Sequence, residues 1–215
     1  MGSSPAERAI LLQIASKSPV GASFRDMTSH DDLEQQVLLL ASRDWKTRRA
    51  ARDALIEAGS PGLSAVLRGL DHAEPPVRRA CLDFLDHHAD ELCIDDLRRI
   101  ALHDPIPHIR RFAVHAFGCV RCKTRPLETD VVEFLGTVAV RSDENIKVRR
   151  EAVYALSHQP PSARAIAALK LVLEQESDRE LLRAAHRVLR LHDPEFRRVT
   201  DERARQASLA RTNRR

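Results

Sequence analysis

The chain has 215 residues, of which 43% are hydrophobic, 31% charged and 4% aromatic, a composition typical of a soluble globular protein. With only 7 glycines and 11 prolines it does not fit strand-and-turn architectures or low-complexity disorder, and no apolar run approaches the ~20 residues of a membrane span. The net charge of +4 belongs to residues 194–215, which hold seven arginines and three acidic residues, so residues 1–193 carry no net charge and give little support for nucleic-acid binding.

Residues 1–30 are predicted to form one short helix followed by a linker. The apolar run Ile10-Leu11-Leu12 is too short for the hydrophobic region of a secretory signal peptide, and Glu7 precedes it. The four cysteines, at positions 81, 93, 119 and 122, are too few for a disulfide framework in a chain of this length. These features predict a protein of a reducing, cytoplasmic compartment that does not associate with membranes.

Residues 31–193 repeat a pattern of two helices. The first helix of each pair, the A helix, is predicted from apolar-periodic runs at residues 33–41, 63–70, 94–102, 131–140 and 165–173. The second, the B helix, is predicted at residues 47–55, 77–85, 109–117, 148–156 and 181–189, whose starts lie 30, 32, 39 and 33 residues apart. Apolar or small residues fall at offsets 0, 4, 7 and 8 of the B helices, which is the spacing of one helix face. The sequence therefore predicts five helical hairpins, numbered here as units one to five.

The B helices of units two to four begin with a valine or isoleucine followed by an arginine. In units three and four an aspartate stands six residues before that arginine, Asp104 before Arg110 and Asp143 before Arg149. This pattern, with alanine and leucine following on the helix, resembles the HEAT repeat, and the short unit length is similar to HEAT-like repeats of the bilin-lyase type. The resemblance implies an all-α fold, a right-handed α-solenoid of about five HEAT-like hairpins over residues 31–193. The recurrent pair is expected to be structural, with the arginine bridging a carboxylate and helix-end carbonyls between units.

Two positions on each B helix, offsets 2 and 6, point away from the predicted core and lie one turn apart. In units one and two they hold an arginine and an aspartate that neutralise each other. In units three to five they hold Arg111 and His115, Arg150 and Tyr154, and Arg183 and Arg187. Because B helices line the concave side of HEAT-type stacks, these six residues predict a basic stripe that binds an acidic peptide, a carboxylate or a phosphate. The alternative is a solvated helix face on which Glu151 and other nearby acids neutralise these groups.

An insertion of about seven residues follows the third B helix and contains Cys119-x-x-Cys122. Together with His115 these thiols are candidate zinc ligands if Gly118 ends the helix, because three residues spread over two helical turns cannot otherwise meet. No second Cys-x-x-Cys and no close carboxylate is expected as a fourth ligand, although Cys93 and the pair His87-His88 belong to the preceding part of the stack. The alternatives are redox chemistry of the cysteine pair and an ordinary inserted loop with free thiols.

Sequence motifs of enzymes are absent. The sequence contains no P-loop, dinucleotide-binding, nucleophile-elbow or zinc-protease motif, and no carboxylate pair is spaced for acid–base catalysis. We therefore predict a non-enzymatic scaffold that binds a protein or acidic peptide and needs no cofactor. Two alternatives stay open: a nucleic-acid binder that uses the stripe and the basic tail, and a lyase accessory or metal-binding protein that uses the loop of Cys119 and Cys122. The tail, residues 194–215, is predicted to begin as a helix at Pro194 and then to weaken.

Overall fold

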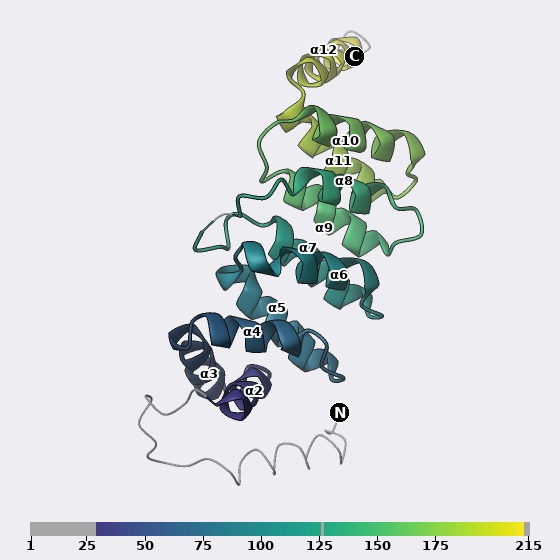
Figure 1. Cartoon of the computed structure of the whole chain (residues 1–215). Coiled ribbons are helices and arrows are strands. Elements are labelled where there is room, and N and C mark those ends of the chain that lie inside the picture. The colour runs from purple at the N-terminus through teal and green to yellow at the C-terminus, as the bar shows by residue number, and fades with distance from the viewer. Residues whose placement is uncertain (1–28, 126, 213–215) are drawn as a thin grey trace.

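The structure, a computed structural model, describes residues 29–125 and 127–212 (Figure 1). Within these two ranges the chain forms eleven α-helices and one 3-10 helix, without a β-strand. The predicted fold class, an all-α repeat solenoid, is confirmed. The short helix and linker predicted near the N-terminus fall on residues 1–30, of which residues 1–28 lie outside the described residues.

The helices form five consecutive hairpins (Figure 1). The A helices are α2 (His30–Leu39), α4 (Ser60–Gly69), α6 (Ile94–His103), α8 (Val132–Val140) and α10 (Ala163–Gln175). The B helices are α3 (Trp45–Glu57), α5 (Pro75–His88), α7 (Pro107–Gly118), α9 (Ile146–Leu156) and α11 (Arg179–His192). A 3-10 helix, η2 (Glu91–Cys93), leads into α6, and α12 (Pro194–Thr212) follows the last hairpin. Because α5 packs on α7, α7 on α9 and α9 on α11, units two to five form one continuous stack.

Local signals set where several helices begin. Asp44 and Asp178 cap α3 and α11, since their carboxylates accept the backbone N–H of Thr47 at 2.9 Å and of Leu181 at 2.8 Å. Helices α5 and α7 carry proline in the first turn, where its missing N–H has no intrahelical partner to lose. Gly59 joins α3 to α4 with a φ of +61°, the left-handed region that favours glycine.

The predicted core positions of the B helices are buried in units two to five, whereas Thr47 and Ala54 of α3 are half-buried. On α7, the side chains of Ile109, Ala113 and Phe117 expose at most 2% of their surface. Phe117 also meets Phe134 of α8 edge to face, with ring centroids 4.8 Å apart. Burying a large aliphatic or aromatic side chain contributes about 1.5–3 kcal/mol, so this shared core is the main force that holds each hairpin to its neighbours.

Gly118 ends α7 and lets two B helices approach closely. A Cβ on this residue would lie 2.6 Å from the Cβ of Ala155 on α9 and 3.1 Å from the Cδ2 of Leu135 on α8. The next residue, Cys119, has extended backbone with φ −82° and ψ 103°. The helix break predicted at Gly118 is thus present. The connection from α7 to α8, residues 119–131, begins immediately after it and contains the insertion; it is called the inserted segment below.

A buried ion pair connects the second and third units. The guanidinium of Arg78 on α5 donates to both carboxylate oxygens of Asp104, at 2.7 and 3.2 Å. It also donates to the backbone carbonyls of His72 and Ala73 at the preceding corner. Asp104 in turn accepts the backbone N–H of Ile106 at 2.8 Å. The arginine therefore joins the corners of two successive units, as the sequence pattern predicts.

The same arrangement recurs along the stack with one change of partner. Arg110 donates to both oxygens of Glu144, at 2.9 and 2.6 Å, and Arg149 lies 2.7 Å from Glu176. The sequence pattern pointed to Asp143 as the acid of the fourth unit, but Asp143 is exposed and pairs with a neighbouring arginine at 3.1 Å. Glu144 takes its place because its longer side chain lies buried at the corner, where the arginine of the preceding unit reaches it.

Helix α12 extends from the last hairpin with no buried residue (Figure 1). The ring of Phe196 packs on His186 of α11 with centroids 5.1 Å apart, and Arg190 pairs with Asp201 at 2.8 Å. The tail predicted to weaken after its first turns is helical to Thr212. None of the helices in the described ranges is long and apolar enough to cross a membrane.

Candidate functional site

The outward positions of the first two B helices are neutralised as the sequence predicts. Arg49 lies 3.7 Å from Asp53 on α3, and Arg79 lies 3.4 Å from Asp83 on α5. Asp83 also approaches Arg52 of α3 at 3.5 Å, so this part of the surface offers little uncompensated charge.

In the third unit the predicted stripe residues share one carboxylate from the next helix. Arg111 donates to Glu151 of α9 at 3.0 Å, and the Nδ1 of His115 lies 2.9 Å from the other oxygen of Glu151. Burial alone would raise the pKa of Glu151, but its contacts with His115 and Arg111 hold this pKa below its usual range. The acid that pairs with His115 thus comes from the next unit rather than from the same helix face, and it is the Glu151 that the alternative interpretation of the stripe named.

The fourth unit follows the same rule. Arg150 pairs with Glu180 at the start of α11, while Tyr154 keeps 40% of its surface exposed. Neutralisation by nearby acids, the alternative interpretation of the stripe, thus describes Arg111, His115 and Arg150.

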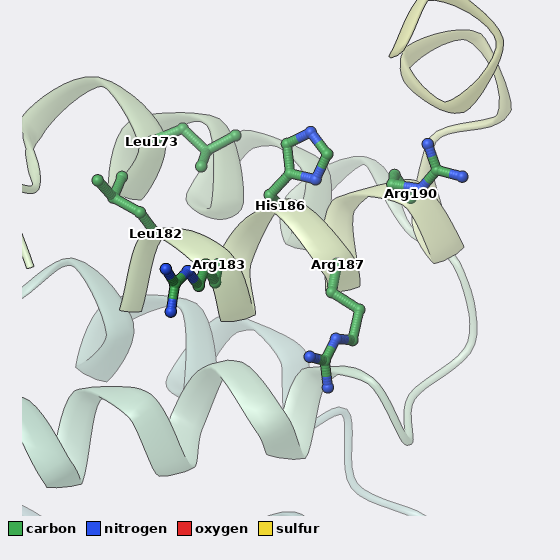
Figure 2. A pocket seen from close by; sticks show the side chains of 6 residues that line it. All are labelled: Leu173, Leu182, Arg183, His186, Arg187 and Arg190. Atoms are coloured by element: carbon green, nitrogen blue, oxygen red, sulfur yellow. The ribbon is translucent and has the colours of Figure 1, made fainter. Parts of the chain in front are cut away.

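The fifth unit differs. Arg183 and Arg187 are exposed on α11, and neither forms an ion pair with any residue in the described part of the chain. The two side chains extend from successive turns of α11 toward the same side (Figure 2). They line an open groove of about 600 Å³ together with Leu173, Leu182, His186 and Arg190. The stripe therefore keeps uncompensated positive charge at one end, beside apolar side chains.

A second cluster forms where the inserted segment leaves α7. The Sγ atoms of Cys119 and Cys122 are 3.2 Å apart, and the Sγ of Cys122 lies 3.5 Å from the Nε2 of His115. The three ligand-type atoms all lie within 4.8 Å of one another. The break after Gly118 thus brings together the three candidate metal ligands that the sequence named.

A carboxylate lies beside this cluster, contrary to the sequence-based expectation. Asp86, near the end of α5, is buried, and its Oδ2 lies 3.6 Å from the Nε2 of His115. Its Oδ1 is buried without a hydrogen-bond partner in the described residues. Of the neighbours considered as a fourth ligand, Cys93 instead faces Asp90 at 3.6 Å, and the Nδ1 of His87 lies 2.8 Å from the backbone carbonyl oxygen of Cys122 rather than near its thiol.

The electrostatics of the cluster follow from its two acids. The carboxylates of Asp86 and Glu151 raise the pKa of His115 to about 11, against the opposing effect of burial. By contrast, burial raises the pKa of the Cys81 and Cys93 thiols to about 12, so these two cysteines are inert packing groups at neutral pH.

One residue of the site escaped the sequence reasoning, Asp86, whereas Glu151 was expected as an acid that neutralises the stripe. Asp86 lies on α5 and Glu151 on α9, the B helices of the units on either side of His115. The spacing of residues within a single helix could not reveal the approach of Asp86 to His115, because the two residues belong to different units.

Comparisons with known proteins bear on the fold. Residues 94–190, from α6 to α11, match the family described as HEAT repeats. No curated protein matches the chain. Among solved structures, the chain is similar to an engineered protein from the Northeast Structural Genomics Consortium, with 19% identity, coverage of 84% of this chain and 86% of that chain, and a TM-score of 0.44.

Proposed function

We propose that this chain, whose residues 94–190 match the family of HEAT repeats, is a non-enzymatic scaffold that binds an acidic protein segment on its B-helix face. HEAT repeats generally mediate protein–protein interaction, and the family is typically non-enzymatic. The proposal adds the chemistry of the partner and the place where it docks. We take the B-helix face to be the concave side of the stack, and the four free thiols agree with a cytoplasmic location.

The observation that carries the proposal is the uncompensated charge of Arg183 and Arg187. In units one to four, the arginine at offset 2 of the B helix has an acid within 4 Å. A guanidinium binds a carboxylate through two parallel hydrogen bonds, so two neighbouring arginines without internal partners are suited to an acidic ligand.

The groove around these arginines also provides apolar contact. Leu173 of α10 and Leu182 of α11 are partly exposed, and the ring of His186 lies beside them (Figure 2). Protein interfaces combine such apolar centres with arginine and aromatic side chains. The fitting partner is therefore a peptide segment in which acidic residues alternate with apolar ones.

The remaining stripe residues have a secondary role in this proposal. Tyr154 and Arg150 lie on α9, the helix stacked on α11, and extend the surface toward the middle of the array. Arg111 and His115 are already bound to Glu151, so a partner that recruited them would first have to break these contacts.

A selection from a random peptide library tests the proposal. The full chain is used as bait, and enriched peptides are synthesised and their affinity is measured by fluorescence anisotropy. We expect enrichment of Asp and Glu next to Leu or Phe, and at least ~10-fold weaker binding by Arg183→Gln/Arg187→Gln, which corresponds to about 1.4 kcal/mol. The control is Arg164→Gln/Arg141→Gln, which removes the same charge from arginines already paired with Asp130 and Asp143.

Three outcomes would contradict the proposal. Enriched peptides without acidic residues would remove its chemical basis, and equal loss of binding in both double variants would show that only net charge matters. Tighter binding of a labelled oligonucleotide than of any peptide, with a steep salt dependence, would favour the nucleic-acid alternative that uses the arginines of α12.

A further inference from the structure

We propose that Asp86, His115, Cys119 and Cys122 form a binding site for one zinc ion that fastens the inserted segment to the repeat stack. The four residues come from α5, α7 and the segment that follows α7. Two thiolates, one imidazole and one carboxylate are ligand types that zinc accepts together.

The distances from the imidazole of His115 to Cys122 and Asp86 suit a tetrahedral ion. Zinc at ~2.0–2.3 Å from each ligand places the ligand atoms about 3.3–3.8 Å from one another in a tetrahedron. The His115 Nε2 lies 3.5 Å from the Cys122 Sγ and 3.6 Å from the Asp86 Oδ2, both within that range. The Cys119 and Cys122 sulfurs, at 3.2 Å, need to separate by about 0.6 Å to reach the spacing of two sulfurs bound to zinc.

The surroundings of His115 match those of a metal-bound imidazole. The Nδ1 atom contacts the carboxylate of Glu151 at 2.9 Å, and Arg111 holds that carboxylate from the other side at 3.0 Å. Such a carboxylate–imidazole contact fixes the ring orientation and leaves Nε2 to bind the ion. It explains why Nε2 faces a thiol and a second carboxylate.

Asp86 gives an independent sign of a metal site. A buried carboxylate oxygen without a hydrogen bond is costly, and the Oδ1 of Asp86 finds no partner within the described ranges. The neighbouring Asp83 and Asp90 do not share this feature, since Asp83 pairs with arginines and Asp90 caps η2.

Buried Lys123 balances the charge of the filled site. Two thiolates and the Asp86 carboxylate carry three negative charges against the two positive charges of zinc. The ammonium of Lys123 donates to the backbone carbonyls of Ala116 and Cys119, which places a positive charge beside the cluster. The ion, its ligands and this lysine therefore sum to neutrality, which favours burial.

The site has a structural role in this proposal because four protein ligands leave no open position for a substrate. The inserted segment already contacts the end of α5, where Thr124 donates its backbone N–H to the carbonyl of His87 at 3.2 Å. An ion bound by Asp86 and the two cysteines would add a second link between the inserted segment and the end of α5.

The test titrates Co²⁺ and Zn²⁺ into the reduced, metal-free full chain. We expect one Co²⁺ per chain, with the charge-transfer absorption of thiolate ligands and the strong visible bands of tetrahedral geometry, both abolished when Zn²⁺ displaces cobalt. Cys119→Ser, Cys122→Ser and His115→Ala should each weaken binding at least ~100-fold, and Glu151→Gln about 10- to 100-fold. The matched control, Cys93→Ala, removes a buried thiol outside the cluster and should bind like the wild type.

A second measurement uses only the wild-type chain, so it does not require the variants to fold. Alkylation followed by mass spectrometry should show that Zn²⁺ protects Cys119 and Cys122 from the reagent. A cobalt spectrum without thiolate absorption, binding unchanged by the cysteine variants, or no protection of these thiols would overturn the proposal. The same holds if the reduced chain takes up no metal and Cys119 and Cys122 simply form a disulfide in air.

Discussion

The buried pair of Arg78 and Asp104 allows a direct test of how the units are held together. Their side chains expose only 8% and 1% of their surface, so Asp104→Asn leaves the Arg78 guanidinium buried without a counter-ion. Removing one partner of a buried ion pair typically costs 3–5 kcal/mol. Because Arg78 keeps its bonds to the carbonyls of His72 and Ala73, and asparagine can still accept the N–H of Ile106, we expect about 3 kcal/mol.

The assay is a double-mutant cycle measured by urea unfolding with far-UV circular dichroism. We expect the double variant Arg78→Met/Asp104→Asn to lose less free energy of unfolding than the two single variants lose together. The difference, which is the coupling free energy, should be about 2 kcal/mol or more. The reference cycle uses Arg164 and Asp130, an exposed pair at 2.8 Å whose side chains expose 62% and 58%, with coupling of at most ~1 kcal/mol.

Repeat arrays do not always unfold in one step, so hydrogen exchange of the α5 and α7 amides accompanies the denaturation curves. Exchange should accelerate on both helices in Asp104→Asn, because the pair joins their two units. Equal coupling in the buried and exposed cycles would refute the reasoning that burial gives this pair its strength.

Two further predictions concern α7. Gly118→Ala should destabilise the chain by about 1–3 kcal/mol, since the new Cβ would meet the Cβ of Ala155 at 2.6 Å; an unchanged urea midpoint would contradict this packing. In metal-free protein with a chelator, Asp86 and Glu151 raise the pKa of His115 to about 11, so its contribution to stability is complete below about pH 6.5 and is lost as pH rises toward 11. An NMR titration should show no His115 transition between pH 5 and 9, whereas Glu151→Gln should lower its pKa; a wild-type transition near pH 6.5 would refute the assignment.

The sequence alone determined the repeat architecture. Periodic apolar residues identify five pairs of helices because the 3.6-residue turn of a helix is a local property, and the caps and prolines that begin the helices are local as well. Gly118 marked the break after α7 for the same reason, and with it the convergence of His115, Cys119 and Cys122.

Only the tertiary structure decided which charges meet. Glu144 rather than Asp143 binds Arg110, and Glu151 neutralises Arg111, across sequence separations of 34 and 40 residues. Spacing within one helix cannot reveal these pairs, because the register between stacked helices depends on side-chain packing and on the length of each corner. The inserted segment folds back onto the end of α5, where Thr124 binds the carbonyl of His87, and Asp86 on the same helix approaches His115.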